Sequence, residues 1–418
     1  MMPRSLLLLP LLLALSTSAP RKIILDQDCS GPATTNTVSA LVLLLEADVE
    51  LLGITISSGD GWPEASLAHC AAVVRMLGLS HRVPVVSGAV YPLSNTAEEA
   101  AIQFPGTLGG WKGAFGLNQS LPHVGVPQDY PEVPLFNSSV PILPCASLPG
   151  VSAFDSVANA AARFMLDQVR AFPGEVTILE LAPATNLAAA ISLGGTNFTR
   201  AVKELWVMGG SLHCAPNPTD PSGRVLCDDA RTPKHEMNFW YDPAAMARVL
   251  QAPWGADRDG ASAVRLVTAD VGFMPGWQRD PRLVSLLATS TLPQVRYLST
   301  CLSPLMLSSP MCDELVAVAW ILSGDANRRL DSLGIGAPEN KFVGLNTTHG
   351  YHYGDTLLWE GGAHDPPPPL PIARRVLLFR NTSSVTLDPF FEKFVALYNE
   401  SAPPMGSRNP EPVTCEWE

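Results

Sequence analysis

Short apolar segments alternate with helical segments along most of the chain, and this alternation limits the fold more than any other feature. The segments at 22–25, 50–56, 176–180, 204–208 and 264–268 are mostly continuous apolar runs. Strands that are apolar on both sides occur in parallel sheets that helices cover on both faces. The sequence therefore predicts an α/β fold with a mainly parallel sheet between two layers of helices.

The composition is that of a globular protein. Of the 418 residues 46% are apolar and 16% are charged, which excludes a disordered, collagenous or coiled-coil chain. The 27 Lys and Arg residues against 39 Asp and Glu residues give a net charge of −12, and no run of basic residues occurs. Because binding to a phosphate backbone requires clustered basic residues, we expect no nucleic acid polymer as a partner.

The first 19 residues have the pattern of a cleaved signal peptide. Arg4 precedes an apolar stretch at 6–15, and small residues follow at 16–19. A bilayer span needs about 20 apolar residues, so this stretch is too short, and we expect no membrane segment. We therefore expect a secreted protein with one domain at 20–400 and a polar tail at 401–418. A Gly-, Pro- and Asn-rich insertion is expected at about 90–150.

Sequons and cysteines fit this expectation of export. Chance would give about two sequons, whereas the chain has six, which favours a glycosylated protein over chance occurrence. Eight cysteines permit disulfide bonds, and we predict one pair, Cys214 with Cys227, because they bracket a turn-rich loop. The predicted glycosylation sites are Asn118, Asn137, Asn197, Asn346, Asn381 and Asn399.

Acidic residues follow the strand segments at the positions where an α/β protein binds its ligands. Asp26 and Asp28 end the first segment, Asp60 follows the second, and Asp313 begins an apolar helical segment. Ligands bind outside the carboxyl ends of the strands in such sheets. Carboxylate and carbonyl oxygens suit Ca²⁺ better than Zn²⁺. For each Asp taken singly, a role in a turn or as a helix cap is the alternative.

Five segments over roughly residues 21–360 form a recognisable pattern. The segment that contains Val207-Met-Gly-Gly210, Glu236-Met-Asn238 and Tyr241-Asp-Pro243 is the most specific of them. The other four are Lys22-Ile-Ile-Leu-Asp-Gln-Asp28, Glu50-Leu-Leu-Gly-Ile-Thr55 with Ser58-Gly59-Asp60, Phe172–Asn186 and Cys312-Asp313-Glu314 with Val316-Ala-Val-Ala319. In motif content and in order, these five segments resemble the inosine/uridine-type nucleoside hydrolases.

The resemblance implies a single doubly wound domain that cleaves the N-glycosidic bond of nucleosides to ribose and free base. Ca²⁺ is implied at the floor of the ribose pocket, where it would bind the sugar hydroxyls and a water molecule. Asp28 would be both a metal ligand and the general base. The further implied metal ligands are Asn36, Asp313 and the carbonyl of Leu181. The implied ribose ligands are Asp60, Glu236 and Asn238, with Asp26, Thr35 and Cys312 as supporting residues.

The chain departs from the family pattern in the loop after Asp28. Thr35 and Asn36 lie where the family has two further acids, which removes negative charge from the metal site. Cys312 replaces a histidine found in many members. Cys29 and Cys312 each neighbour a proposed ligand, and a disulfide between them is a further hypothesis.

Three functions therefore stay open. The first is a secreted N-ribohydrolase, the second is an inactive relative that binds a nucleoside or another ribosyl ligand, and the third is a secreted interaction glycoprotein on the same fold. The preferred base also stays open, although Trp62, Trp111 and Trp277 could stack on one. Many family members are homo-oligomers, and the sequence does not decide whether this chain forms one.

Overall fold

The computed structural model describes a mixed α/β core. The described residues are 19–29, 39–40, 43, 48–61, 63–76, 79–96, 98–99, 159–212, 234–255, 263–272, 312–323, 338–359 and 373–379. Most of the predicted signal peptide, most of the predicted insertion and the whole predicted tail lie outside these ranges.

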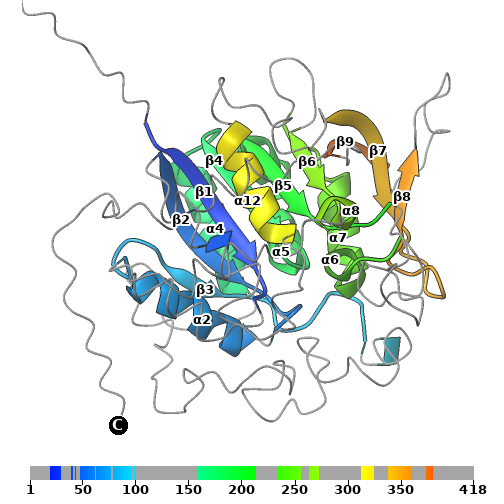
Figure 1. The fold of residues 1–418 in the computed structure, drawn as a ribbon, viewed down its shortest axis with the longest axis horizontal. Coiled ribbons are helices and arrows are strands. Elements are labelled where there is room, and N and C mark those ends of the chain that lie inside the picture. Colours follow the sequence, from blue (N-terminus) through cyan, green and yellow to red (C-terminus); the bar gives the residue numbers. More distant parts are fainter. Residues whose placement is uncertain are drawn as a thin grey trace, which may run out of the picture.

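The described strands form one sheet, in the order β3-β2-β1-β4-β5-β6-β9-β7-β8 (Figure 1). All pairs from β3 through β6 to β9 are parallel, whereas β7 pairs antiparallel with both β8 and β9. This confirms the predicted mainly parallel sheet. The strands are β1 (Arg21–Gln27), β2 (Val49–Ile56), β3 (Val85–Ser87), β4 (Val176–Leu181), β5 (Glu204–Met208), β6 (Val264–Val267), β7 (Glu339–Leu345), β8 (Thr356–Trp359) and β9 (Ala373–Phe379).

Helices cover both faces of the sheet, as the apolar strands predicted. In Figure 1, α12 crosses the front of the sheet, and α4 and α5 lie behind it. The helices are α2 (Pro63–Met76), α4 (Ala160–Ala171), α5 (Thr185–Ala201), α6 (Met237–Tyr241), α7 (Pro243–Gln251), α8 (Ala269–Gly272) and α12 (Cys312–Ser323). None of the helices in the described part of the chain has the length and apolar character needed to cross a bilayer.

Two separate apolar cores hold these layers together. Ile23 and Leu25 of β1 pack into one core with α2 and α12, whereas Ile24 packs into the other with α4, α5 and α7. Successive side chains of a strand point to opposite faces, so one strand contributes to both cores. Every residue of α12 from Cys312 to Leu322 is buried, which explains why its sequence shows no polar face.

The strand order reverses at β1, and this reversal sets the position of the site. From β1 the chain proceeds through β2 and β3 to one side of the sheet, and then through β4, β5 and β6 to the other. Doubly wound folds bind ligands in the crevice at the carboxyl ends of the strands where the order reverses. The ends of β1 and β4 therefore flank the expected binding position.

Candidate functional site

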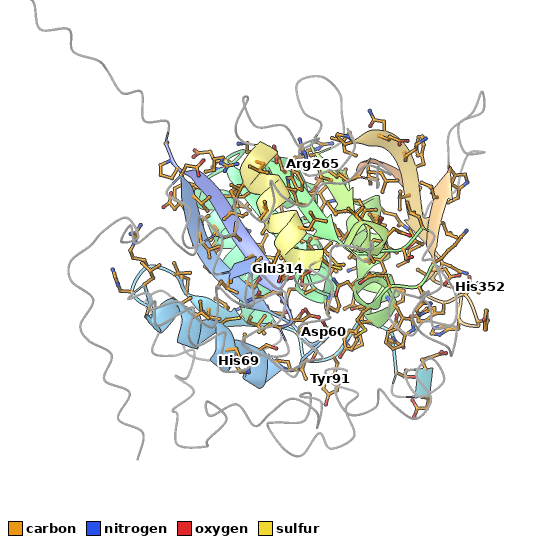
Figure 2. The ribbon with its side chains drawn as sticks, in the orientation of Figure 1. Asp60, His69, Tyr91, Arg265, Glu314 and His352 are labelled. Atoms are coloured by element: carbon orange, nitrogen blue, oxygen red, sulfur yellow. The ribbon has the colours of Figure 1, made fainter. Side chains whose placement is uncertain are left out.

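Two acidic residues and two strand-terminal residues lie at the carboxyl ends of four adjacent strands. Asp28 follows β1, Asp60 follows β2, Leu181 ends β4 and Met208 ends β5. Because these strands are parallel neighbours, their ends lie at one edge of the sheet. Figure 2 shows Asp60 at this edge, below the first turn of α12, where Glu314 is labelled.

Asp28 is buried in this edge, and its orientation is fixed. Its Oδ2 accepts a hydrogen bond of 2.7 Å from the backbone N–H of Asp60. Burial raises the pKa of Asp28 well above its usual value, and the negative charges of Asp60 and Asp313 raise that pKa further. The structure thus brings together three predicted site residues from β1, β2 and α12, although Asp313 is far from the others in sequence.

Gly59 makes this arrangement sterically feasible. A Cβ atom at this position would lie 1.9 Å from Asp28 Oδ2 and 2.7 Å from Cδ of Pro183. Only a residue without a side chain therefore fits between the Asp28 carboxylate and Pro183, which precedes α5. The Ser58-Gly59-Asp60 motif was noted in the sequence, but the steric role of its glycine appears only in the folded structure.

Asp26 lies beneath the site and links three elements. Its Oδ1 accepts hydrogen bonds from Thr55 Oγ1 of β2, at 2.6 Å, and from Asn186 Nδ2 of α5, at 2.9 Å. Asn186 Oδ1 in turn accepts from the N–H of Ala89 at 2.8 Å. Burial raises the pKa of Asp26 to about 6. These contacts suit the predicted supporting role of Asp26, because they hold the end of β1 against β2 and α5.

Glu180 is a buried acid that the sequence interpretation assigned only to a strand. It pairs in register with Asp26 across β1 and β4, and it directly precedes Leu181. Its side chain is fully buried beside that of Asp26. Burial raises its pKa well above the usual value, and the charge of Asp26 raises it further. An acid within an apolar strand next to the binding edge was the signal that could have identified it.

Glu236 caps the short helix α6. Its carboxylate accepts hydrogen bonds from the N–H groups of Asn238, at 2.9 Å, Phe239, at 3.1 Å, and Gly210, at 2.7 Å. Gly210 has a φ of 73°, a conformation that favours glycine. Glu236 therefore fixes the turn after β5 to the start of α6. Its predicted contact with ribose stays a prediction.

Asn238 is held at the end of β5. Its Nδ2 lies 3.2 Å from the carbonyl oxygen of Met208, to which it donates, and 3.3 Å from the sulfur of the same residue. This places both residues beside the strand end next to Leu181. Met208 was not among the predicted site residues, although it precedes the Gly-Gly pair of the most specific motif.

The donor atoms at this edge suit a hard cation. Asp28 and Asp313 offer carboxylates, and Leu181 ends a strand at the same edge, which matches the oxygen preference of Ca²⁺. A divalent cation would also oppose the charge effects that raise the pKa of Asp28. No three His, Cys, Asp or Glu side chains in the described part of the chain form a complete set of metal ligands. The predicted ligand Asn36 and its neighbour Thr35 lie outside the described residues.

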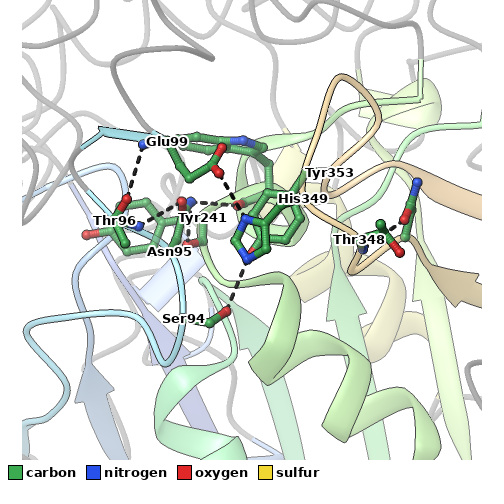
Figure 3. Close-up of polar contacts among 10 residues, drawn as sticks. Ser94, Asn95, Thr96, Glu99, Tyr241, Thr348, His349 and Tyr353 are labelled. Carbon is green, nitrogen blue, oxygen red and sulfur yellow. Dashed lines mark hydrogen bonds and ion pairs between the residues drawn. The ribbon is translucent and has the colours of Figure 1, made fainter.

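The segment after β3 is held over α6 and the turn between β7 and β8 (Figure 3). The Leu93 N–H donates to Asp242 Oδ2 at 2.8 Å, and Asn95 Nδ2 donates to the carbonyls of Trp240 and Tyr241 at 3.2 Å. Further contacts with the turn join Ser94 to Tyr353 and Glu99 to His349. The sequence interpretation treated this segment as the start of an insertion and did not predict these contacts.

The cysteines and sequons are only partly within the described residues. Cys29, Cys70 and Cys312 are buried, and the structure contains no disulfide between Cys29 and Cys312, so it does not support the hypothesis of that bond. Cys29 lies instead against Cys70. Asn197 is exposed and Asn346 is half-buried. The predicted Cys214–Cys227 disulfide and the sequons at Asn118, Asn137, Asn381 and Asn399 lie outside the described ranges.

Solved structures of nucleoside hydrolases share this fold. A plant nucleoside hydrolase aligns with a TM-score of 0.61 and 19% identity over 91% of this chain and 99% of its own. A purine-preferring ribonucleoside hydrolase from Gardnerella vaginalis aligns with a TM-score of 0.57 and 16% identity over 90% of this chain and 98% of its own.

Sequence relatives include nucleosidases from plants. Uridine nucleosidase 1 of Arabidopsis thaliana is 27% identical over 56% of this chain and 54% of its own length. Probable uridine nucleosidase 1 of Oryza sativa is 28% identical over 57% of each chain. This chain thus spans about half of the length of these curated relatives.

The family model for inosine-uridine preferring nucleoside hydrolases matches residues 23–378, which is most of the chain. Members of this family generally depend on a metal, often Ca²⁺. The matched range begins in β1 and ends in β9, so it includes every strand of the described sheet. The chain therefore belongs to the inosine-uridine preferring nucleoside hydrolase family.

Proposed function

We propose that the protein is a Ca²⁺-dependent N-ribohydrolase that cleaves nucleosides to ribose and free base. The observation that carries this proposal is the position of Asp28. Its carboxylate lies at the strand edge where the order reverses, held by Asp60 and close enough to Asp313 for their charges to interact. A general base of this reaction must be held in one orientation beside the substrate.

Asp28 would remove a proton from the attacking water molecule. The hydrogen bond from Asp60 fixes one oxygen of its carboxylate, so its orientation does not depend on the substrate. Asp28, Asn36, Asp313 and the carbonyl of Leu181 would hold Ca²⁺, which would bind the vicinal sugar hydroxyls and lower the pKa of the water. Asp60 and Asn238 would hydrogen-bond the ribose, and Glu236 would keep Asn238 in place through the α6 cap.

Nucleosides are the proposed substrate class, and the base preference is left to experiment. The curated plant relatives are named for uridine, whereas the aligned enzyme from Gardnerella vaginalis is named for purines. Uridine is thus the first substrate to test, with inosine second. Release of reducing sugar from a panel of common nucleosides, with Ca²⁺ or with a chelator, measures the activity and the preference together.

The Asp28→Asn variant tests the role of Asp28 as the general base. The amide cannot accept the proton, so we expect the rate of ribose release to fall by about 10²- to 10⁴-fold. Asp167→Asn is the matched control, because Asp167 is an exposed residue of α4 whose side chain is 72% accessible. A wild-type protein that releases no ribose from any nucleoside, or an Asp28→Asn variant with an unchanged rate, contradicts the proposal.

Calorimetry separates this proposal from the alternative of an inactive binding protein. The altered loop at Thr35 and Asn36 is the observation that motivates that alternative, because it replaces two acids expected to help bind the metal and the sugar and leaves two carboxylates at the metal in place of three. Tight nucleoside binding in the presence of Ca²⁺ without release of ribose supports the binding protein. Turnover supports the enzyme.

Export through the secretory pathway is a further part of the proposal. The apolar stretch at 6–15 with small residues after it supports cleavage near residue 19. Expression of the full chain in cultured eukaryotic cells, followed by N-terminal sequencing of protein from the medium, tests it. We expect a mature N-terminus close to Arg21. Retention of Met1 in a protein confined to the cytosol contradicts it.

A further inference from the structure

Two buried cysteines lie in contact directly behind the proposed general base. Cys29 follows Asp28 at the end of β1, and Cys70 lies in α2. Their Sγ atoms are 3.6 Å apart, and both residues are fully inaccessible to solvent. The pair takes no part in the proposed reaction.

Further contacts hold the two cysteines in this position. Ser66 Oγ of α2 donates a hydrogen bond of 2.5 Å to the carbonyl of Cys29, whose thiol lies 3.6 Å from the carbonyl of Ser66. Gln27 Nε2 donates to Cys70 Sγ. The end of β1 and the first turns of α2 are therefore joined on both sides of the thiol pair, so the two sulfur atoms cannot easily separate while the fold is intact.

We propose that Cys29 and Cys70 form a disulfide that ties the residue after Asp28 to α2. The sulfur atoms of a disulfide lie about 2 Å apart, so small torsional changes of the two side chains would complete the bond. The two thiols lose two protons and two electrons as the S–S bond forms. A disulfide oxidant such as oxidised glutathione accepts them, and its own S–S bond breaks to give two thiols.

The complete burial of the pair determines when the bond forms and how it behaves. A soluble oxidant reaches these thiols only before α2 closes on β1, so we expect oxidation during folding in an oxidising compartment. Once formed, the disulfide is shielded from reductants in the native protein. It also restricts the unfolded chain over the long segment between its ends, which stabilises the fold.

The sequence allows a direct measurement by mass spectrometry. No Lys or Arg lies between Lys22 and Arg75, so trypsin releases both cysteines in one peptide, 23–75, with no other cysteine. The full chain is expressed behind a heterologous secretion leader, so that the result does not depend on residues 1–19, and its free thiols are alkylated in denaturant. We expect this peptide to be unalkylated and lighter by two hydrogen atoms than the reduced form. Additional cleavage after Glu46 should leave two fragments joined only by the disulfide.

Two variants serve as controls for this assignment. In Cys70→Ser, peptide 23–75 should carry one alkyl group, and the melting temperature should fall by more than about 5 °C. In Cys312→Ser, which changes another buried thiol, the cross-link should persist. If Cys70→Ser does not fold, the wild-type peptide still decides the question.

Either of two results overturns the inference. The first is peptide 23–75 from the secreted wild-type protein carrying two alkyl groups without prior reduction. The second is a cross-link from Cys29 or Cys70 to any other cysteine. Neither readout depends on ribose release. A failure of the disulfide inference is therefore distinguishable from a failure of the proposed hydrolase function.

Discussion

The absence of a side chain at Gly59 is as important for the site as the carboxylate of Asp28. In Gly59→Ala, the new Cβ would lie 1.9 Å from Asp28 Oδ2, so the carboxylate has to move. A misplacement of a catalytic group by about 1 Å can lower activity by about 100-fold. We expect that loss in the rate of ribose release, with folding checked by circular dichroism.

Gly255→Ala is the matched control for this prediction. The nearest atom to a Cβ at Gly255 would be 3.7 Å away, which is an ordinary contact. This variant should keep the wild-type rate. Equal rates for Gly59→Ala and the wild type would show that ribose release does not depend on the position in which Gly59 allows the Asp28 carboxylate to lie.

His69 should make the protein less stable in weak acid. Figure 2 shows His69 on α2, and burial lowers its pKa to about 3. The unfolded state takes up a proton below pH 6.5 whereas the folded state does not, so the folded state loses stability as the pH falls. From pH 7 to pH 5 this effect is about 2 kcal/mol. His69→Gln should remove it, as measured by urea unfolding at both pH values.

The comparison of wild type with His69→Gln separates the effect of His69 on stability from the effects of the buried carboxylates. The raised pKa of Asp26 acts in the opposite direction, because its folded form takes up a proton below about pH 6. Since Asp26 is present in both proteins, its effect cancels in the difference. The same pH dependence in wild type and His69→Gln would contradict the prediction.

At the scale of single residues, the sequence predicted the acids that meet but not their surroundings. The convergence of Asp28, Asp60 and Asp313 was expected from the ends of predicted elements and from a family resemblance, and charge interactions in the structure agree with it. Glu180 was missed because its position in an apolar strand marks it as unusual but does not show which residues its side chain meets. Only its register opposite Asp26 shows that the two acids share one buried space.

At the scale of elements, Asp242 connects three parts of the fold. Its side chain caps α7 through the N–H of Ala245 and also accepts from Thr185 Oγ1 of α5 and the N–H of Leu93. Asp242→Ala removes all three hydrogen bonds and leaves buried donors without partners. We expect a loss of about 2–4 kcal/mol in the free energy of unfolding, measured in urea.

Asp167→Ala provides the comparison for this loss. Asp167 is an exposed residue whose ion pair with Arg170 is also exposed. Its removal should change the free energy of unfolding by less than about 0.5 kcal/mol. If both variants lose the same small amount, Asp242 does not anchor the segment after β3.

The strands differed in how well the sequence predicted them. The parallel strands β1, β2, β4, β5 and β6 were predicted because they are apolar on both faces. The strands β7 to β9 were missed, since β7 begins with exposed residues and lies near the edge of the sheet. A strand with one solvent-facing side lacks the continuous apolar pattern on which the prediction depended.

At the scale of the whole molecule, Ca²⁺ binding should stabilise the folded state. Because the proposed ligands come from β1, β4 and α12, the unfolded chain does not present them together. At a concentration of about 100 times the dissociation constant, binding stabilises the native state by about 2.7 kcal/mol. We expect a rise of several degrees in the melting temperature when Ca²⁺ replaces a chelator.

Asp313→Asn tests whether this rise comes from the proposed site. The variant keeps the size of the side chain but removes one of the two proposed carboxylate ligands. Its melting temperature should respond weakly or not at all to the same Ca²⁺ concentration. An equal response in the variant and the wild type would place any bound calcium elsewhere in the protein.

The sequence by itself determined the α/β class and the parallel sheet, and it predicted the edge of that sheet at which ligands are expected to bind. Those features follow from apolar periodicity and chain order, which are local properties. The tertiary structure alone decided that Cys29 contacts Cys70, that Glu180 lies opposite Asp26, and that Gly59 makes room for Asp28. These contacts depend on strand register and on how helices pack across the sheet, and neither is encoded in a short segment of sequence.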